Sequence, residues 1–190
     1  MRATKESHRK MKHASLFSVV AVLGLGVLAC SPTASLAAPL TSNRVARVRA
    51  AIEKVYHDED VATMRGDVNA AMSYYAKTYT VVLPTGQTST YEAMKKDIKP
   101  LLEQTRPRQR SLRSNSKIIT FKLNGANEAQ AKTKSESVQT LVDPMTQQTI
   151  IVASYSTTLD NFVRQSGHWV HQKSVVLASR VTNNGRVVRQ

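Results

Sequence analysis

The spacing of hydrophobic residues changes near the middle of the chain, from the period of a helix to that of a strand. Val45, Val48, Ile52 and Val55 recur at intervals of three and four residues, which places them on one face of a helix. From Lys117 onward, apolar and polar residues alternate, as they do on a strand with one buried face. The first part of the chain is therefore predicted to be mainly helical, and the second part to form a sheet.

The segment that joins these two parts contains a helix stop and a helix start. Gly66 suits the left-handed residue that ends a helix, and the carboxylate of Asp67 can cap the next one. The pattern predicts a helix of about 20 residues ending at Gly66, a short helix over 68–75, and a strand over 79–83. Thr90 can cap a further helix, in which Pro100 predicts a kink or a division into two pieces.

Four strands linked by short turns are predicted in the second part. They cover residues 117–123, 128–142, 149–163 and 169–180. Strands joined by hairpin-length links form an antiparallel meander. Helices followed by such a meander predict an α+β fold, in which a curved antiparallel sheet covers its apolar face with the N-terminal helices. The domain is expected over 42–180, with a tail over 181–190 that frays.

The N-terminal region predicts export. Residues 16–29 form a run of small and apolar side chains behind a basic stretch, which has the length of a signal-peptide core. Two cleavage sites compete: one after Ala37, giving a signal peptide over 1–37, and one before Cys30, giving a lipoprotein signal over 1–29 and a lipidated cysteine. The protein is accordingly expected to be periplasmic or secreted, or anchored to a membrane through Cys30.

The composition limits the chemistry. A single cysteine excludes an intramolecular disulfide framework and a multi-thiolate metal site. The chain has no GxSxG, P-loop, GxGxxG or HExxH motif, so hydrolase, nucleotide-dependent and zinc-protease functions have no support. We predict no cofactor and no metal.

The formal net charge of +14 favours anionic partners. Five basic residues fall within one segment, which we expect to be extended and exposed: Arg106, Arg108, Arg110, Arg113 and Lys117. This segment could adhere to an anionic membrane or polymer of the cell envelope, or could simply be a solvated loop. No aromatic residue lies between Tyr91 and Phe121 to stack on bases, so nucleic acid is not an expected partner.

The order of several short motifs resembles the nuclear transport factor 2-like superfamily, in particular its SnoaL-like and ketosteroid isomerase-like bacterial branch. The motifs are Tyr56, Gly66-Asp67, Tyr75-Ala76, the strand and turn from Tyr79 to Gly86, Tyr91-Glu92-Ala93-Met94 and Gly167-His168-Trp169. The resemblance implies a cone-shaped fold that encloses a pocket, and a homodimer formed through the sheet. It also implies that the position of the ketosteroid isomerase base is occupied here by Leu83, which cannot abstract a proton.

Several residues are candidates for lining such a pocket. Tyr56 lies three and four residues before Glu59 and Asp60 on one helix, so a phenol and a carboxylate could converge. Alternation places Trp169, His171 and Lys173 on one strand face. The predicted ligand-binding residues are Tyr56, Tyr79, Leu83, Tyr155, Trp169 and His171. The same residues could equally be core packing without any ligand.

Three functions remain open from the sequence. The first is an exported, non-catalytic binding or accessory protein with a hydrophobic, aromatic-lined pocket for a small apolar or aromatic ligand. The second is an isomerase, dehydratase or cyclase that uses Tyr56, Glu59 or Asp60, and His171. The third is adhesion to an anionic surface through the basic segment.

Overall fold

The computed structural model describes residues 42–188. The predicted signal peptide, both cleavage sites and Cys30 lie outside the described residues. The helical elements are α1 (Ser42–Arg65), α2 (Val68–Met72), α3 (Tyr91–Thr105) and the 3₁₀ turn η1 (Arg106–Arg108). The strands are β1 (Tyr75–Val82), β2 (Thr88–Thr90), β3 (Gln109–Leu123), β4 (Glu128–Val142), β5 (Thr149–Gln165), β6 (His168–Asn183) and β7 (Arg186–Val188).

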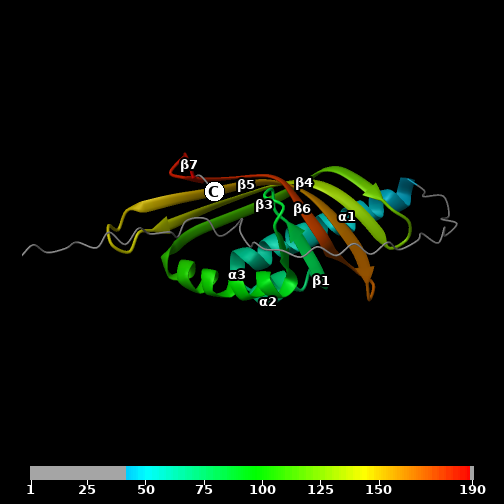
Figure 1. Cartoon of the computed structure of the whole chain (residues 1–190), viewed down its shortest axis with the longest axis horizontal. Coiled ribbons are helices and arrows are strands. Elements are labelled where there is room, and N and C mark those ends of the chain that lie inside the picture. The colour runs from blue at the N-terminus through cyan, green and yellow to red at the C-terminus, as the bar shows by residue number, and fades with distance from the viewer. Residues whose placement is uncertain (1–41, 189–190) are drawn as a thin grey trace, which may run out of the picture.

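The strands form one sheet in the order β2-β1-β6-β5-β4-β3, and β7 pairs with β6. Strands β3 to β6 are an antiparallel meander, whereas β1 lies parallel to β6. The long strands make a curved upper layer in Figure 1, with α2 and α3 below it and α1 running along its inner side. This is the predicted α+β arrangement, a curved sheet covered by N-terminal helices.

The joint between α1 and α2 forms for the reasons that the sequence suggested. Gly66 has a positive φ of 70°, which the absence of a Cβ permits, and it ends α1. Asp67 caps α2, because its Oδ1 accepts a hydrogen bond from the backbone N of Ala70 at 2.9 Å. The turn reverses the chain, so α1 lies against the sheet while α2 approaches α3.

The main core lies between α1 and the inner face of β3 to β6. Ile52 is fully buried there, and Phe162 is 1% exposed. The apolar residues of α1 face the strands because they recur at helical spacing. The core consists of Ile52, Val55, Tyr56, Ile118, Leu123, Ala129, Ala131, Phe162 and Trp169.

The basic segment was predicted wrongly as an extended connector. It forms the turn η1, and β3 then begins at Gln109 instead of residue 117. The inner positions of early β3 carry serine instead of apolar side chains, so the alternating pattern that marks a half-buried strand was weak there.

The C-terminal tail differs from expectation, and of the two alternatives for the helix after Thr90 the division into two pieces is wrong. α3 is one continuous helix that contains Pro100, not two pieces. Pro100 and Lys96, whose carbonyl loses its N–H partner, are both exposed, so solvent can hydrate that carbonyl. The tail does not fray before Val188: Asn184 and Gly185 both have positive φ and turn the chain back into β7.

Candidate functional site

A cavity of about 350 Å³ lies between the helices and the inner face of the sheet. Its residues come from the end of α1, from α2 and α3, from β1 and β2, and from the middle of β3 to β6. The cavity lies beside the last turns of α1, from which Glu59, Asp60 and Thr63 line it. This position makes it the candidate site.

Glu59 is the best-placed acid–base group of the cavity wall. Its side chain is 21% exposed, its Oε1 accepts a short hydrogen bond from the phenol of Tyr75, and its Oε2 lies 3.3 Å from Nε2 of His171. The Tyr75 ring stacks on the imidazole with ring centres 4.8 Å apart. Burial and the neighbouring carboxylate of Glu59 raise the pKa of Tyr75, so the phenol stays protonated and donates.

His171 lies behind this wall instead of lining the cavity. It is 3% exposed and is enclosed by the rings of Tyr56, Tyr75, Tyr79 and Phe162. Neither ring nitrogen makes a hydrogen bond within residues 42–188, although Nε2 lies within ion-pair distance of Glu59. The imidazole can therefore orient Glu59 but does not face a ligand directly.

A second polar network lies under α1, and its members Tyr56, Thr133 and Asp160 are buried. The phenol of Tyr56 donates to Oδ2 of Asp160 at 2.6 Å and accepts from Oγ1 of Thr133 at 2.8 Å. Thr158 also donates to Asp160, at 2.7 Å. Burial, and then the negative charge of Asp160, raise the pKa of Tyr56. This network fixes the end of α1 that carries Glu59.

Asp60 is a second carboxyl group in the cavity wall. Its Oδ1 accepts a hydrogen bond from Ser114 at 2.5 Å. Its pKa is raised by burial, an effect that the hydrogen bond from Ser114 partly offsets and the charge of Glu59 reinforces. Asp60 is therefore more readily protonated than an exposed aspartate.

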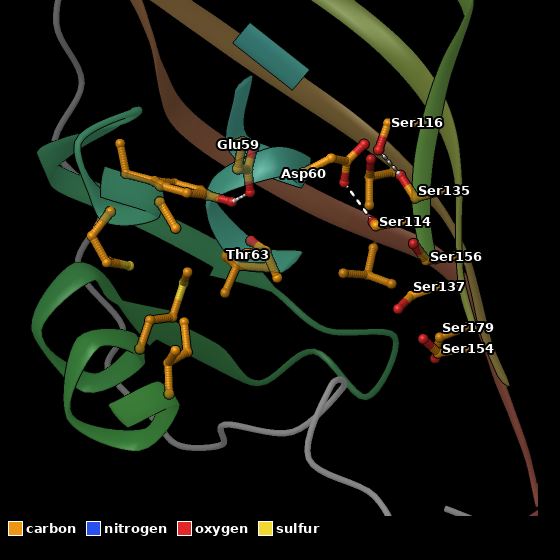
Figure 2. A pocket seen from close by; sticks show the side chains of 18 of the residues that line it. Glu59, Asp60, Thr63, Ser114, Ser116, Ser135, Ser137, Ser154, Ser156 and Ser179 are labelled. Carbon is orange, nitrogen blue, oxygen red and sulfur yellow. Dashed lines mark hydrogen bonds between the residues drawn. The ribbon is translucent and has the colours of Figure 1, made fainter. Parts of the chain in front are cut away.

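The two sides of the cavity differ in chemistry. The sheet side carries serines from β3 to β6, which are labelled in Figure 2: Ser114, Ser116, Ser135, Ser137, Ser154, Ser156 and Ser179. The helix side combines a group of apolar side chains with several carboxyl groups. The apolar residues are Val68, Met72, Met94, Ile98 and Leu101, and the acids are Glu59, Asp60, Asp67 and Asp97. The cavity is thus amphipathic, and less aromatic than the sequence predicted.

The predicted ligand-binding residues are divided between cavity and core. Tyr79 and Leu83 line the cavity, whereas Tyr56 and Trp169 belong to the core. Tyr155 borders the cavity, but its ring lies against the guanidinium of Arg180, 4.8 Å away, because its neighbours Ser154 and Ser156 take the inward positions.

The predicted alternation on β6 fails at Lys173. The register between β5 and β6 shifts where Asn161 pairs with Lys173 and Phe162 pairs with His171. This bulge removes Lys173 from the face of Trp169 and His171, so Lys173 is exposed and Ser174 is buried instead.

The five basic residues of this segment have different surroundings. Arg106 lies beside Gly66, and Nε of Arg108 donates to the carbonyl of Val142 at 3.0 Å. Arg110 is exposed, and Arg113 and Lys117 are exposed on the outer face of β3.

Two features of the site were missed from the sequence. Asp160 gave no signal, because a single aspartate within a strand pattern reads as an exposed residue. The serines, in contrast, did give a signal in the sequence. The pattern Ser-x-Ser occurs on three successive strands, at 114–116, 135–137 and 154–156.

Neither a metal centre nor a membrane-spanning helix is found in the described part of the chain. Within residues 42–188, no three His, Cys, Asp or Glu side chains gather as a metal site would require. Over the same range, no helix combines the length and the apolar character needed to cross a bilayer.

No family model and no curated protein matches the sequence. Solved structures do match the fold. A putative scytalone dehydratase from Novosphingobium aromaticivorans has a TM-score of 0.62 at 15% identity, over 78% of this chain and 94% of that one. The hexachlorocyclohexane dehydrochlorinase LinA-type3 from Novosphingobium barchaimii has a TM-score of 0.52 at 15% identity, over 76% and 97%.

A protein of unknown function from Nostoc punctiforme, described as having a cystatin-like fold, is also similar. Its TM-score is 0.50 at 14% identity, over 72% of this chain and 92% of that one. At these identities the likeness concerns the fold alone. The fold of this chain is thus cystatin-like, in agreement with the curved sheet and N-terminal helices that its sequence predicted.

Proposed function

We propose that the protein binds a small molecule in the cavity and catalyses an elimination by proton transfer, as a dehydratase does. The observation that carries this proposal is Glu59, a carboxylate in the cavity wall with Tyr75 on one oxygen and His171 beside the other. Carboxylates held in this way are typical of general bases, because their neighbours fix the orientation of the lone pairs.

The second carboxyl group supplies the acid that an elimination needs. Glu59 would take a proton from a carbon next to a carbonyl, and the electron pair would form a carbon–carbon double bond as the adjacent C–O bond breaks. The leaving hydroxyl would take the proton of Asp60 and depart as water. The raised pKa of Asp60 suits this role, since two carboxyl groups in different environments can divide acid and base tasks.

The similar structures support this class of reaction by analogy. One is described as a putative dehydratase and another as a dehydrochlorinase, and both names denote eliminations. Fold likeness does not assign a function by itself, so the proposal depends on the residues of the site.

The proposal is tested with small β-hydroxy ketones, whose dehydration gives conjugated enones that absorb in the ultraviolet. We expect Glu59→Gln to lower the rate of enone formation by about 10² to 10⁴, the usual contribution of a general base. Glu53→Gln is the matched control, because Glu53 lies on the same helix, is 49% exposed and pairs only with Arg49 among the described residues. Equal rates for wild type, Glu53→Gln and Glu59→Gln would contradict the assignment of the base.

A non-catalytic binding protein is the second candidate, favoured by two observations. Leu83 lines the cavity where the resemblance would place a ketosteroid isomerase base, and His171 is shielded from the cavity by Tyr75. Native mass spectrometry of protein purified from its own host would support this candidate if it found a ligand that the protein leaves unchanged.

Export, membrane anchoring and dimerisation are parts of the same proposal. The apolar run over 16–29 supports delivery to the cell envelope, and the fold supports a homodimer formed through the sheet. The mass of the mature protein and of its oligomer, measured from fractionated host cells, would decide between cleavage after Ala37 and lipidation of Cys30. Recovery of the uncleaved chain from the cytosol would contradict export.

A further inference from the structure

The serines of the cavity form two ladders that cross the sheet in register. In one ladder Ser114 pairs with Ser137, which pairs with Ser154. In the other, four serines follow one another across four strands: Ser116, Ser135, Ser156 and Ser179. Because side chains alternate along a strand, a Ser-x-Ser pair on each strand places both hydroxyls on the same face. Figure 2 shows these hydroxyls on the cavity side of the strands.

Three of the serine hydroxyls in these ladders are not used to hold the described part of the protein together. Ser114 donates to Asp60, and Ser116 and Ser135 bond to each other at 3.0 Å. Within residues 42–188, Ser137, Ser154 and Ser156 make no side-chain hydrogen bond. A sheet face that only needed to pack would carry apolar residues, as the same strands do under α1.

A separate residue on another element also lacks a partner. Ser89 of β2 borders the same cavity and is 2% exposed, yet its hydroxyl has no hydrogen-bond partner among residues 42–188. A buried hydroxyl without a partner costs free energy, so native proteins usually pair it with protein, water or ligand. Ser89 is therefore a second, independent indication of a polar molecule in the cavity.

The charges around the cavity exclude an anion. Within residues 42–188 no lysine, arginine or histidine lines it, although the net charge of the chain is +14. Its lining instead includes the acids Glu59, Asp60, Asp67 and Asp97. A carboxylate or phosphate would lose its hydration there without gaining a positive partner. Serine hydroxyls, in contrast, both donate and accept hydrogen bonds to neutral groups.

We infer that the cavity binds a neutral, polyhydroxylated ring compound, with its oxygens against the serine ladders and its apolar face against Met72, Met94 and Ile98. Neighbouring strands lie about 4.8 Å apart and alternate residues about 6.8 Å apart, so the ladders match oxygens spread over a ring system better than a single polar group. This inference rests on the proposed function only in taking the cavity as the ligand site, and it names the ligand class.

Calorimetry with a set of probe compounds tests the ligand class. Resveratrol is a neutral hydroxylated aromatic, stilbene is its counterpart without hydroxyls, stilbene carboxylate is an anionic counterpart, and cellobiose is a neutral saccharide. We expect the full-length mature protein to bind resveratrol or cellobiose at least tenfold more tightly than stilbene carboxylate. The probe that binds more tightly shows whether the natural ligand is a hydroxylated aromatic compound or a saccharide. Preference for the carboxylate, or binding of neither hydroxylated probe, would overturn the inference.

The double variant Ser137→Ala/Ser154→Ala tests the role of the ladders. We expect it to weaken binding of the hydroxylated probe by about tenfold, with stilbene unaffected, since two neutral hydrogen bonds are lost. Ser111→Ala is the matched control, because Ser111 is an exposed serine of β3 outside the cavity. Unchanged affinity in the double variant would contradict the assignment.

The same variants separate this inference from the proposed function. If Glu59→Gln keeps wild-type affinity for the hydroxylated probe but loses elimination activity, both stand. If the serine variant loses affinity while Glu59→Gln changes no measured rate, the ligand class stands and the elimination fails. If Glu59→Gln loses activity and the serine variant binds normally, the elimination stands and the ligand class fails.

Discussion

Two halves of the same strands present different chemistry on one inner face. Under α1, the inward residues of β3 to β5 include Ile118, Ala129, Ala131 and Phe162, and all four are buried. Beyond the end of α1, the inward residues of these strands are the serine ladders. The strands and their alternation are the same in both halves. What differs is the covering layer: a helix in the covered half, and a cavity in the open half.

A row of threonines marks the border between the halves. Thr133 and Thr158 pair across β4 and β5, and both bond to the buried network of Tyr56 and Asp160. The threonine hydroxyls here are hydrogen-bonded to the protein itself, whereas Ser137, Ser154 and Ser156 of the open half make no side-chain hydrogen bond within residues 42–188. The comparison teaches that inward polarity on a sheet indicates a binding surface only where the protein leaves the groups unpaired.

Removing a large side chain from the covered half should have the largest effect. Phe162→Ala is expected to lower the free energy of unfolding by about 3–5 kcal/mol, because it leaves a cavity in a packed core. Urea denaturation measures this loss. Met145→Ala, at a residue 83% exposed, should stay within about 0.5 kcal/mol of wild type. A loss below about 1 kcal/mol for Phe162→Ala would mean that the covered half is not the core.

Breaking the border network should have an intermediate effect. Tyr56→Phe removes the hydroxyl that joins Asp160 to Thr133, and we expect a loss of about 1–3 kcal/mol, since buried partners are left unpaired. Asp160→Asn should cost less, because its amide oxygen can still accept from Tyr56. The two variants are compared by thermal and urea unfolding, and the reverse order would argue against the network.

The pH dependence of stability should reveal the raised pKa of Asp60, a carboxyl group in the open half. A carboxyl whose pKa is raised in the folded protein adds stability below its ordinary pKa of about 3.9, and this contribution is lost as the pH rises through the raised value. We therefore expect Asp60→Asn to gain stability relative to wild type between pH 4 and pH 7. Urea titrations at both values measure the gain, and Glu53→Gln should show none.

Replacing a single serine of the open half should have the smallest effect on stability. Ser154→Ala is expected to change the free energy of unfolding by less than about 0.5 kcal/mol, because its hydroxyl makes no hydrogen bond within residues 42–188. A loss above about 1 kcal/mol would show that the ladders support the fold, which would remove the contrast between the halves.

The covered half was largely predictable from the sequence, and the open half was not. The helical spacing of α1 and the Gly66-Asp67 joint are local signals, and they predicted the helices that cover the sheet. The ends of β3 and β6 were missed because strand signals depend on apolar alternation, which serines do not show. Asn184-Gly185 was a tight-turn signal that was overlooked.

The partners in the site depend on contacts that no local pattern encodes. Tyr56 was expected to meet Glu59 or Asp60 on its own helix, but it bonds to Asp160, 104 residues away. Glu59 instead meets Tyr75 and His171, which come together through the parallel pairing of β1 with β6. Spacing on one helix can suggest that two groups are neighbours, but the sheet decides which groups they meet.

The parallel pairing of β1 with β6 also affects the order in which the chain can fold. Strands β3 to β6 are joined by hairpins, so each pair can form by closing a short loop. The pairing of β1 with β6 encloses the rest of the sheet in one long loop, which costs more entropy to close and is expected to form late. The wall of the cavity that carries Tyr79 is therefore expected to join the wall that carries the serine ladders late, so the cavity is incomplete during most of folding.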